Sequence, residues 1–311
     1  QVVQPPLNLA DYASPLAAYR YLELDAKDMT MFTVAGLPQG ARLRLAAMDA
    51  YDGHVYSVAD ASAAFLRIGE RTSGTGRGTP TTLSIAVAGY TGLWLPGGGD
   101  VRGVRFGGPQ AERQAEGLYY NSYGGTLLTT ATVGDGDRYT VDLVVPPAVD
   151  RASVTKVAAA SEPALERVPD AITTAATDLA GDAGSPLEQL QRIEKKLQEG
   201  YYSDGSDGKS RAGHTAERIA SMLTAPTLVG DDEQYAVAMA LMARQLGIPA
   251  RVVTGYQGGE LNPVDGTLVI RQSDAHAWAE VWLAGSGWQR IDPTAASAPL
   301  RIENGLAAAL P

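Results

Sequence analysis

Short apolar runs with partial alternation fill the chain from about residue 41 to residue 146. Runs such as "ARLRLAAMDAY", "TTLSIAVAGY" and "DRYTVDLVVP" are separated by clusters of Gly, Asp and Pro. Alternation with a period of two is typical of half-buried strands, and several short strands at this spacing favour a sandwich or barrel. The pattern predicts an N-terminal β-sandwich-like domain in residues 1–155.

The spacing of apolar residues becomes helical in the second half of the chain. The stretch "SPLEQLQRIEKKLQEG" is bounded by Ser185 and Gly200, and Glu188 completes a capping box, so a helix is predicted between them. Further helices are predicted at "TAERIASML" and "DDEQYAVAMALMARQLG". The runs "PARVVTGY", "GTLVIRQ", "HAWAEVWL" and "WQRID" then predict an antiparallel sheet. Helices followed by strands indicate an α+β core in residues 156–311, with the boundary between residues 151 and 162.

Two Gly-rich stretches, "SGTGRGTP" and "LPGGGD", lie between predicted strands. A phosphate-binding loop needs a strand before it and a helix after it, and no helix follows either stretch. Both are therefore interpreted as hairpin loops.

Composition and charge exclude several classes of protein. Lys and Arg total 25 and Asp and Glu total 35, so the net charge of −10 argues against nucleic acid and anionic membrane surfaces as partners. The chain has no cysteine, which excludes disulfides, thiolate metal sites and thiol nucleophiles. No apolar run reaches the roughly 18 residues that a membrane-spanning helix needs. A start at Gln1 and an end at "GLAAALP" lead us to expect a processed protein or an excised extramembrane piece.

Three blocks in the second half carry a family resemblance. "GDDEQYAVAMALMARQLGIPARVVTGYQGGE", "RQSDAHAWAEVWL" and "GWQRIDPTAA" resemble the transglutaminase-like superfamily, whose papain-like core carries a Cys-His-Asp triad. They look most like the extracytoplasmic domain of bacterial multi-pass membrane proteins of this superfamily. The resemblance implies that His276 stands at the position of the base and Asp292 at that of the orienting acid. Asp232 stands where the family has its nucleophilic cysteine.

Asp231, Asp232 and Glu233 begin a predicted helix, and three readings of them stay open. They can be helix caps, with Asp232 ion-paired to His276 and no catalysis. Asp232 and His276 can position a water for hydrolysis. Asp232, His276 and Asp292 can instead bind a divalent metal. Further residues are expected to border the same cleft, although Trp278 can equally pack in the core and Glu280 can be solvated: Asp231, Glu233, Tyr256, Gln257, Trp278 and Glu280.

The length of the loop between "HAWAEVWL" and "WQRID" decides whether His276 and Asp292 can belong to one triad. A regular two-residue loop at Gly285 and Ser286 would place His276 and Asp292 on opposite faces of the sheet. A three-residue loop or a bulge would place them on one face. The triad reading therefore predicts such an irregularity.

The function expected from the sequence is a catalytically degenerate transglutaminase-like domain. It would bind a peptide or cell-envelope component, or scaffold a membrane assembly, on the extracytoplasmic face of the cell membrane. Segments absent from this chain would tether it there, and no cofactor, resident metal or nucleic acid is expected. The alternative is a thiol-independent amidase or peptidase that uses Asp232, His276 and Asp292 on cell-envelope substrates. The sequence predicts no oligomeric state.

Overall fold

The chain divides into two compact units, each built from segments that lie far apart in sequence. The computed structural model describes residues 7, 9, 12–16, 26–59, 65–72, 74, 76–146, 164–206, 210–285 and 287–295. Unit 1 comprises Gln1–Met48, Ser57–Ala148 and Val253–His276. Unit 2 comprises Asp49–Tyr56, Val149–Val252 and Ala277–Pro311. The predicted domain boundary lies outside the described residues, and the division at residue 155 stays a prediction.

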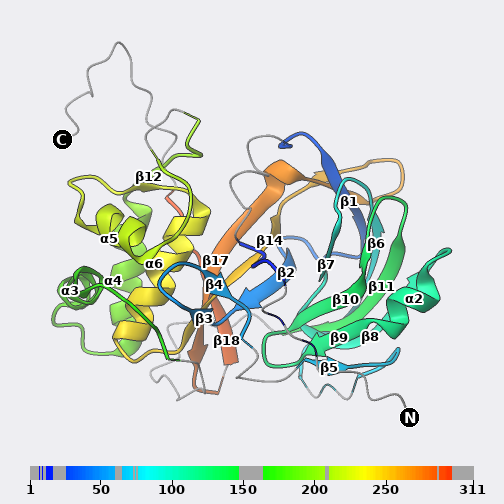
Figure 1. Cartoon of the computed structure of the whole chain (residues 1–311), viewed down its shortest axis with the longest axis horizontal. Coiled ribbons are helices and arrows are strands. Elements are labelled where there is room, and N and C mark those ends of the chain that lie inside the picture. Colours follow the sequence, from blue (N-terminus) through cyan, green and yellow to red (C-terminus); the bar gives the residue numbers. More distant parts are fainter. Residues whose placement is uncertain are drawn as a thin grey trace. The chain divides into compact units, whose positions relative to one another are not determined.

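Unit 1 contains two antiparallel sheets in its described part (Figure 1). The six-stranded sheet has the order β15-β16-β1-β6-β11-β8, and the four-stranded sheet has the order β5-β9-β10-β7. The bounds are β1 (Thr30–Ala35), β5 (Leu66–Arg67), β6 (Thr79–Val87), β7 (Gly92–Leu95), β8 (Asp100–Gly107), β9 (Leu118–Asn121), β10 (Thr126–Val133), β11 (Arg138–Val145), β15 (Glu260–Leu261) and β16 (Leu268–Arg271). A short helix, α2 (Ala111–Glu116), precedes β9.

Alternating apolar residues give unit 1 its core. In β6, Leu83, Ile85 and Val87 are buried, whereas Thr82 and Ser84 between and beside them are exposed. Residues from the strands of both sheets join one hydrophobic cluster. Two sheets around a shared core are the arrangement of a β-sandwich, and the predicted mixture of a strand-rich N-terminal part and an α+β core is confirmed.

Two details of unit 1 differ from the sequence prediction. The stretches "SGTGRGTP" and "LPGGGD" are followed by strands, as predicted, but each leads from the four-stranded sheet to the six-stranded one, so neither is a hairpin loop. The predicted strand at "GTLVIRQ" forms as β16, but it pairs with β1 and not with the strands of the C-terminal core. Periodicity identifies a strand but does not name its neighbour.

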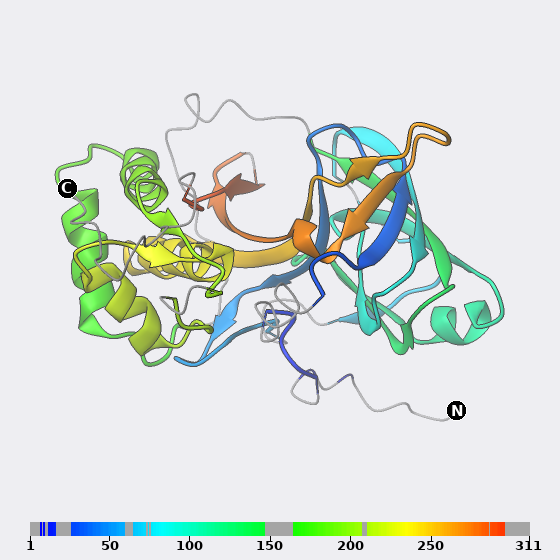
Figure 2. The same ribbon diagram turned by 90° about the horizontal axis from the view of Figure 1, so that it is seen from above.

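Unit 2 contains four helices in its described part, and they gather in one group (Figures 1 and 2). Their bounds are α3 (Asp170–Ala180), α4 (Pro186–Gln198), α5 (Ala216–Thr224) and α6 (Asp232–Gln245). Short pairs of strands accompany them: β3 (Ala50–Tyr51) with β4 (Tyr56–Ser57), and β12 (Tyr201–Tyr202) with β13 (Val229–Gly230).

Helix α6 is the central helix of this group. Seen from above in Figure 2, the yellow α6 lies beside the green helices. Every residue from Asp232 to Ala243 is buried, so the helix has no solvent-facing stripe over that length. The predicted stripe through Tyr235 and Met242 is therefore only one side of a helix that is surrounded. Gly247 ends it with a left-handed φ of 75°, as its place after the helix predicted.

A further four-stranded sheet has the order β18-β17-β14-β2. Its strands are β2 (Arg42–Met48), β14 (Ala250–Gln257), β17 (Ala275–Leu283) and β18 (Gly287–Ile291). Strands β14 and β17 each contribute residues to both units. None of the described helices is long and apolar enough to cross a membrane.

Replacing Ser185 by alanine is expected to lower the free energy of unfolding by about 1 kcal/mol. The Ser185 hydroxyl oxygen accepts the Glu188 N–H at 3.2 Å and caps α4. The Glu188 carboxylate accepts the Gly184 N–H at 2.9 Å, one residue earlier than the predicted capping box requires. Chemical denaturation measures the change. Ser221→Ala on the exposed side of α5 is the control and should leave stability within about 0.5 kcal/mol.

Candidate functional site

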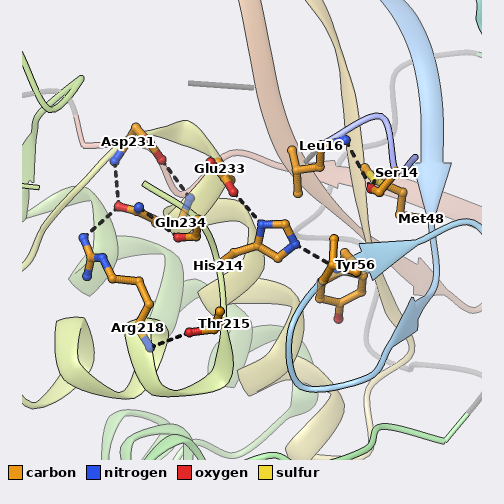
Figure 3. Close-up of polar contacts among 12 residues, drawn as sticks. Ser14, Leu16, Met48, Tyr56, His214, Thr215, Arg218, Asp231, Glu233 and Gln234 are labelled. Atoms are coloured by element: carbon orange, nitrogen blue, oxygen red, sulfur yellow. Dashed lines mark hydrogen bonds and ion pairs between the residues drawn. The ribbon is translucent and has the colours of Figure 1, made fainter. Parts of the chain in front are cut away.

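The N-terminus of α6 begins with a capping box. The Asp231 carboxylate accepts the Gln234 backbone N–H at 3.1 Å, and the Gln234 side-chain carbonyl accepts the Asp231 N–H at 3.4 Å (Figure 3). Asp231 is fully buried. The reading of this acid as a helix cap is confirmed, and its carboxylate also lies at the positive end of the helix dipole.

Gln234 anchors this first turn to the loop before α5. Its side-chain amide nitrogen donates to the carbonyl oxygens of Arg211 and Gly213 at 2.6 and 3.0 Å. Its side-chain oxygen accepts from the Arg218 guanidinium at 2.9 Å (Figure 3). Because Gln234 is fully buried, these bonds satisfy polar groups that water does not reach. The start of α6 is therefore held firmly within unit 2.

Glu233 has a specific partner that the sequence analysis missed. Its carboxylate lies 2.5 Å from Nδ1 of His214, and both side chains are 3% exposed. The Nε2 atom of the same imidazole accepts the backbone N–H of Tyr56 at 2.8 Å (Figure 3). Glu233 is thus a buried bonding partner in unit 2. No local pattern could reveal this, because the three residues are far apart in sequence and His214 follows a stretch of loop composition.

Asp232, the residue at the position of the family nucleophile, is the first residue of α6. It is buried, with 6% of its surface exposed. In the sequence it stands between an acid that caps the helix and an acid bonded to histidine, in the turn where helix N–H groups and the helix dipole favour an anion.

The β17–β18 hairpin has the irregularity that the triad reading predicted. Trp282 faces Trp288 and Leu283 faces Gly287, so three residues, 284–286, connect the strands. Gly285 in this connection has a left-handed φ of 78°. The prediction of a loop longer than two residues is confirmed.

This register decides which side chains share a face of the hairpin. Side chains alternate along a strand, so His276, Trp278 and Glu280 share one face of β17. Ile291 pairs with Ala279, and the next position, Asp292, therefore falls on the face of Trp278 and Glu280. The opposite face carries the half-buried Gln289, which pairs with Val281, and otherwise mainly buried apolar residues: Ala277, Ala279, Val281, Leu283 and Ile291.

Helix α4 fixes the backbone of Asp292. The Glu194 carboxylate accepts the Asp292 N–H at 3.3 Å, and the Gln198 side chain donates to the Asp292 carbonyl at 2.8 Å. The Asp292 carboxylate accepts the Thr294 N–H at 3.2 Å. Glu194 and Gln198 are one turn apart on α4, so one face of the helix holds the strand end. These bonds fix the backbone position of Asp292, from which its carboxylate extends. The catalytic role of Asp292 stays a prediction.

Glu280 and Trp278 are buried in unit 2. The Arg251 guanidinium donates to one Glu280 oxygen from Nε at 2.9 Å and from Nη2 at 2.8 Å, and it lies 3.9 Å from the ring centroid of Trp288. The Trp278 indole N–H lies 3.5 Å from the other Glu280 oxygen. The reading of Glu280 as solvated is wrong, because Glu280 is 7% exposed and ion-paired. Trp278, 3% exposed, takes the core position that the sequence left open.

The remaining predicted residues lie at the ends of strands. Tyr256 belongs to the core of unit 1, where its ring meets Phe32 edge-on at 5.3 Å, and burial raises the pKa of its phenol well above the ordinary value. Gln257 follows it and is exposed. His276, near the start of β17, is 9% exposed. Within the described residues, no group of three or more His, Asp or Glu side chains is placed to hold a metal ion.

Comparison with known proteins gives matches to one superfamily. The model of the transglutaminase-like superfamily matches residues 173–293. Protein-glutamine gamma-glutamyltransferase of Pseudomonas aeruginosa is 59% identical over 76 residues, which are 24% of this chain and 11% of that protein. The uncharacterized protein YebA of Bacillus subtilis is 25% identical over 133 residues, which are 42% of this chain and 18% of that protein. The chain thus spans only a small part of the length of these curated relatives.

Solved structures agree on the fold. The crystal structure of the periplasmic domain of TgpA from Pseudomonas aeruginosa bound to ethylmercury has a TM-score of 0.62 and 23% identity, and the match covers 93% of this chain and 96% of that one. A second crystal structure of the same periplasmic domain has a TM-score of 0.61 and 22% identity, with 89% and 91% covered. Residues 173–293 thus match a transglutaminase-like domain by the family model, and the solved structures show that the chain shares its fold with that periplasmic domain.

Proposed function

We propose that this chain is a catalytically degenerate transglutaminase-like domain that binds a peptide or a cell-envelope component, or scaffolds a membrane assembly. The observation that carries the proposal is Asp232, a buried carboxylate at the first position of α6 in a chain without cysteine. That position matches the family's nucleophilic cysteine in the resemblance described above. In this proposal the domain keeps the histidine and aspartate positions of the family motif, His276 and Asp292, and lacks the cysteine thiol.

The chemistry of a carboxylate argues against the family reaction. Acyl transfer from an amide begins with attack of a thiolate, and a carboxylate is a poor nucleophile toward an amide. Its product would be a mixed anhydride, a high-energy acyl carrier. A fixed anion also repels the negative charge that develops on the amide oxygen, where a single donor usually contributes about 2.7–4 kcal/mol. Asp232 thus removes the nucleophile and opposes the transition state.

The hydrolase alternative needs a water as well as a substrate at Asp232. A carboxylate that acts as a general base must contact both, whereas a thiol at the same position would contact the substrate alone. Asp232 is 6% exposed and His276 is 9% exposed, so little of either residue meets solvent. Glu233, the other acid inside the first turn, is bonded to His214. The alternative of an amidase or peptidase using Asp232, His276 and Asp292 therefore ranks second.

The proposal also includes the cellular location of the chain. The relative with the similar fold is named as a periplasmic domain, and the match extends over 93% of this chain. We propose that this chain also lies on the extracytoplasmic face of the cell membrane, tethered by further segments of a longer protein. The net charge of −10 supports a partner other than nucleic acid.

The decisive variant restores the thiol. We expect purified chain and Asp232→Ala to show no amine incorporation, deamidation or peptide hydrolysis. Asp232→Cys should show at least one of these activities, at a rate about 100-fold or more above the background rate measured with the wild type. A positioned base contributes at least about that factor to the rate of an available nucleophile. Rates with glutamine-containing peptides and a primary amine measure this.

Two outcomes would contradict the proposal. Turnover by the wild type that is lost in Asp232→Ala would favour the hydrolase alternative. No activity in a folded Asp232→Cys would mean that the surroundings of the family reaction have not been kept. Ser221→Cys is the control, because it adds a thiol on the exposed side of α5 and should stay inactive.

A further inference from the structure

His214 is bonded through both ring nitrogens in the interior of unit 2 (Figure 3). The backbone N–H of Tyr56 is a donor that can neither rotate away from its role nor give up its proton at ordinary pH. Nε2, which accepts this N–H at 2.8 Å, must therefore carry no proton. The ring proton sits on Nδ1 and is donated to the Glu233 carboxylate. The two bonds together fix one neutral tautomer of the imidazole.

The segment that His214 holds is Asp49–Tyr56, the part of unit 2 that comes from the N-terminal half of the chain. The Tyr51 hydroxyl donates to the His214 carbonyl oxygen at 2.8 Å, and the Ala216 N–H donates to the Gly53 carbonyl oxygen at 2.8 Å. Tyr51 and Tyr56 are 2% and 0% exposed, and their rings lie 4.9 Å apart. The segment is thus hydrogen-bonded to the chain at the start of α5, and His214 makes two of these bonds.

Within the described part of the chain, titratable residues face the imidazole from two elements. Glu233 faces it from α6, and Tyr51 and Tyr56 face it from the Asp49–Tyr56 segment. Burial, together with the charges of Tyr56, Asp52 and Glu217, raises the pKa of Tyr51 far above its ordinary value, so this phenol stays neutral on acidification. The clamp therefore depends on Nε2 of His214, the ring nitrogen that carries no proton in this geometry.

We propose that His214 is an acid-sensitive clamp that holds the Asp49–Tyr56 segment in unit 2. A proton taken from solvent at Nε2 places a second N–H against the N–H of Tyr56, and that hydrogen bond opens. The Nδ1–H bond to Glu233 does not conflict with this proton, so the imidazolium can stay bonded to α6 while the Tyr56 end of the segment is freed and the bonds of Tyr51 and Gly53 remain. The clamp is independent of the function proposed above, because it requires neither catalysis nor a ligand.

The same geometry distinguishes His214 from a catalytic base. A glutamate and a histidine in contact look like the acid–base part of a hydrolytic site. In such a site Nε2 is open to the nucleophile, whereas here it is occupied by a backbone amide. The Glu233–His214 pair therefore binds a segment of its own chain and is not positioned to activate a nucleophile.

Hydrogen exchange at the Tyr56 amide in the full chain tests the clamp. We expect its protection, corrected for the intrinsic exchange rate, to fall about five- to tenfold between pH 8 and pH 5, the range in which histidine takes up a proton. The Gln189 amide, which donates to Ser185 in α4, serves as the internal reference and should not follow this change. Long-range nitrogen NMR at pH 8 should show a proton on Nδ1 of His214 and none on Nε2.

Matched variants separate the clamp from general acid effects. In His214→Gln the side-chain oxygen can accept from Tyr56 and does not titrate, so protection should stay high and level at both pH values. In His214→Asn the shorter amide can bond Glu233 only, so protection should be low at both. His54→Gln removes the exposed histidine of the same segment and should retain the wild-type profile.

The clamp is refuted by any of three results. One is an Nε2–H tautomer of His214 at pH 8. Another is a Tyr56 protection in the wild type that is the same at pH 8 and pH 5. The third is a fall in His214→Gln as large as in the wild type. The first two use only the wild-type protein, so they decide the matter even if a variant fails to fold.

Discussion

Replacing Arg251 by alanine is expected to lower the free energy of unfolding by about 3–5 kcal/mol. The change leaves the Glu280 carboxylate, 7% exposed, without the guanidinium that donates to it at 2.8 and 2.9 Å. It also removes the cation from the face of Trp288, 3.9 Å away. A buried charge that loses its partner is costly because water cannot replace the lost interaction. Urea unfolding followed by tryptophan fluorescence measures the loss.

The chain offers a matched control in Arg271. Its guanidinium contacts the Glu260 carboxylate at 2.7 Å, but the two side chains are 36% and 66% exposed. Arg271→Ala should therefore cost less than about 1 kcal/mol. A double variant, Arg251→Met with Glu280→Leu, should recover much of the loss of Arg251→Ala, since neither charge remains buried. Equal losses for Arg251→Ala and Arg271→Ala would contradict the assignment.

The second large effect is expected for Leu241→Ala in α6, at about 2–5 kcal/mol of unfolding free energy. Leu241 is fully buried, and its neighbours on the helix are buried on every side. Truncation therefore leaves a cavity that solvent does not fill, and the lost transfer energy and the cavity both destabilise the fold. Thermal and denaturant unfolding of the two proteins give the difference.

Leu261→Ala is the control for this cavity. Leu261 in β15 is 61% exposed, so the same chemical change removes little buried surface. Its effect should stay within about 0.5 kcal/mol. A loss below about 1 kcal/mol for Leu241→Ala would mean that α6 is less tightly surrounded than its burial indicates.

Local patterns predicted the elements well. The start and stop residues of α4 and the spacing along α6 gave both helices, and the alternation in β6 and β11 gave strands. These features depend on neighbouring residues, which the sequence shows directly. The longer connection between β17 and β18 was predicted differently: the family resemblance required His276 and Asp292 on one face, and hairpin parity then required the extra residue.

Features that join distant segments could not be predicted in this way. The pairing of β16 with β1 and the contacts of Glu233 with His214 and of Arg251 with Glu280 each depend on tertiary structure. Glu280 alternates onto a polar face in the sequence, and only the arginine on β14 explains why it is buried. Asp232 is a fourth case: the motif gave its position, whereas its burial follows from packing around α6.

The pairing of β1 with β16 also affects how unit 1 folds during synthesis. Thr30 is among the first described residues to be made, and its strand partner Arg271 is among the last. The six-stranded sheet of unit 1 therefore stays incomplete, with one side of β1 unpaired, until β16 has emerged. Such distant pairing slows folding, and it leaves the edge of β1 open to non-native pairing for longer.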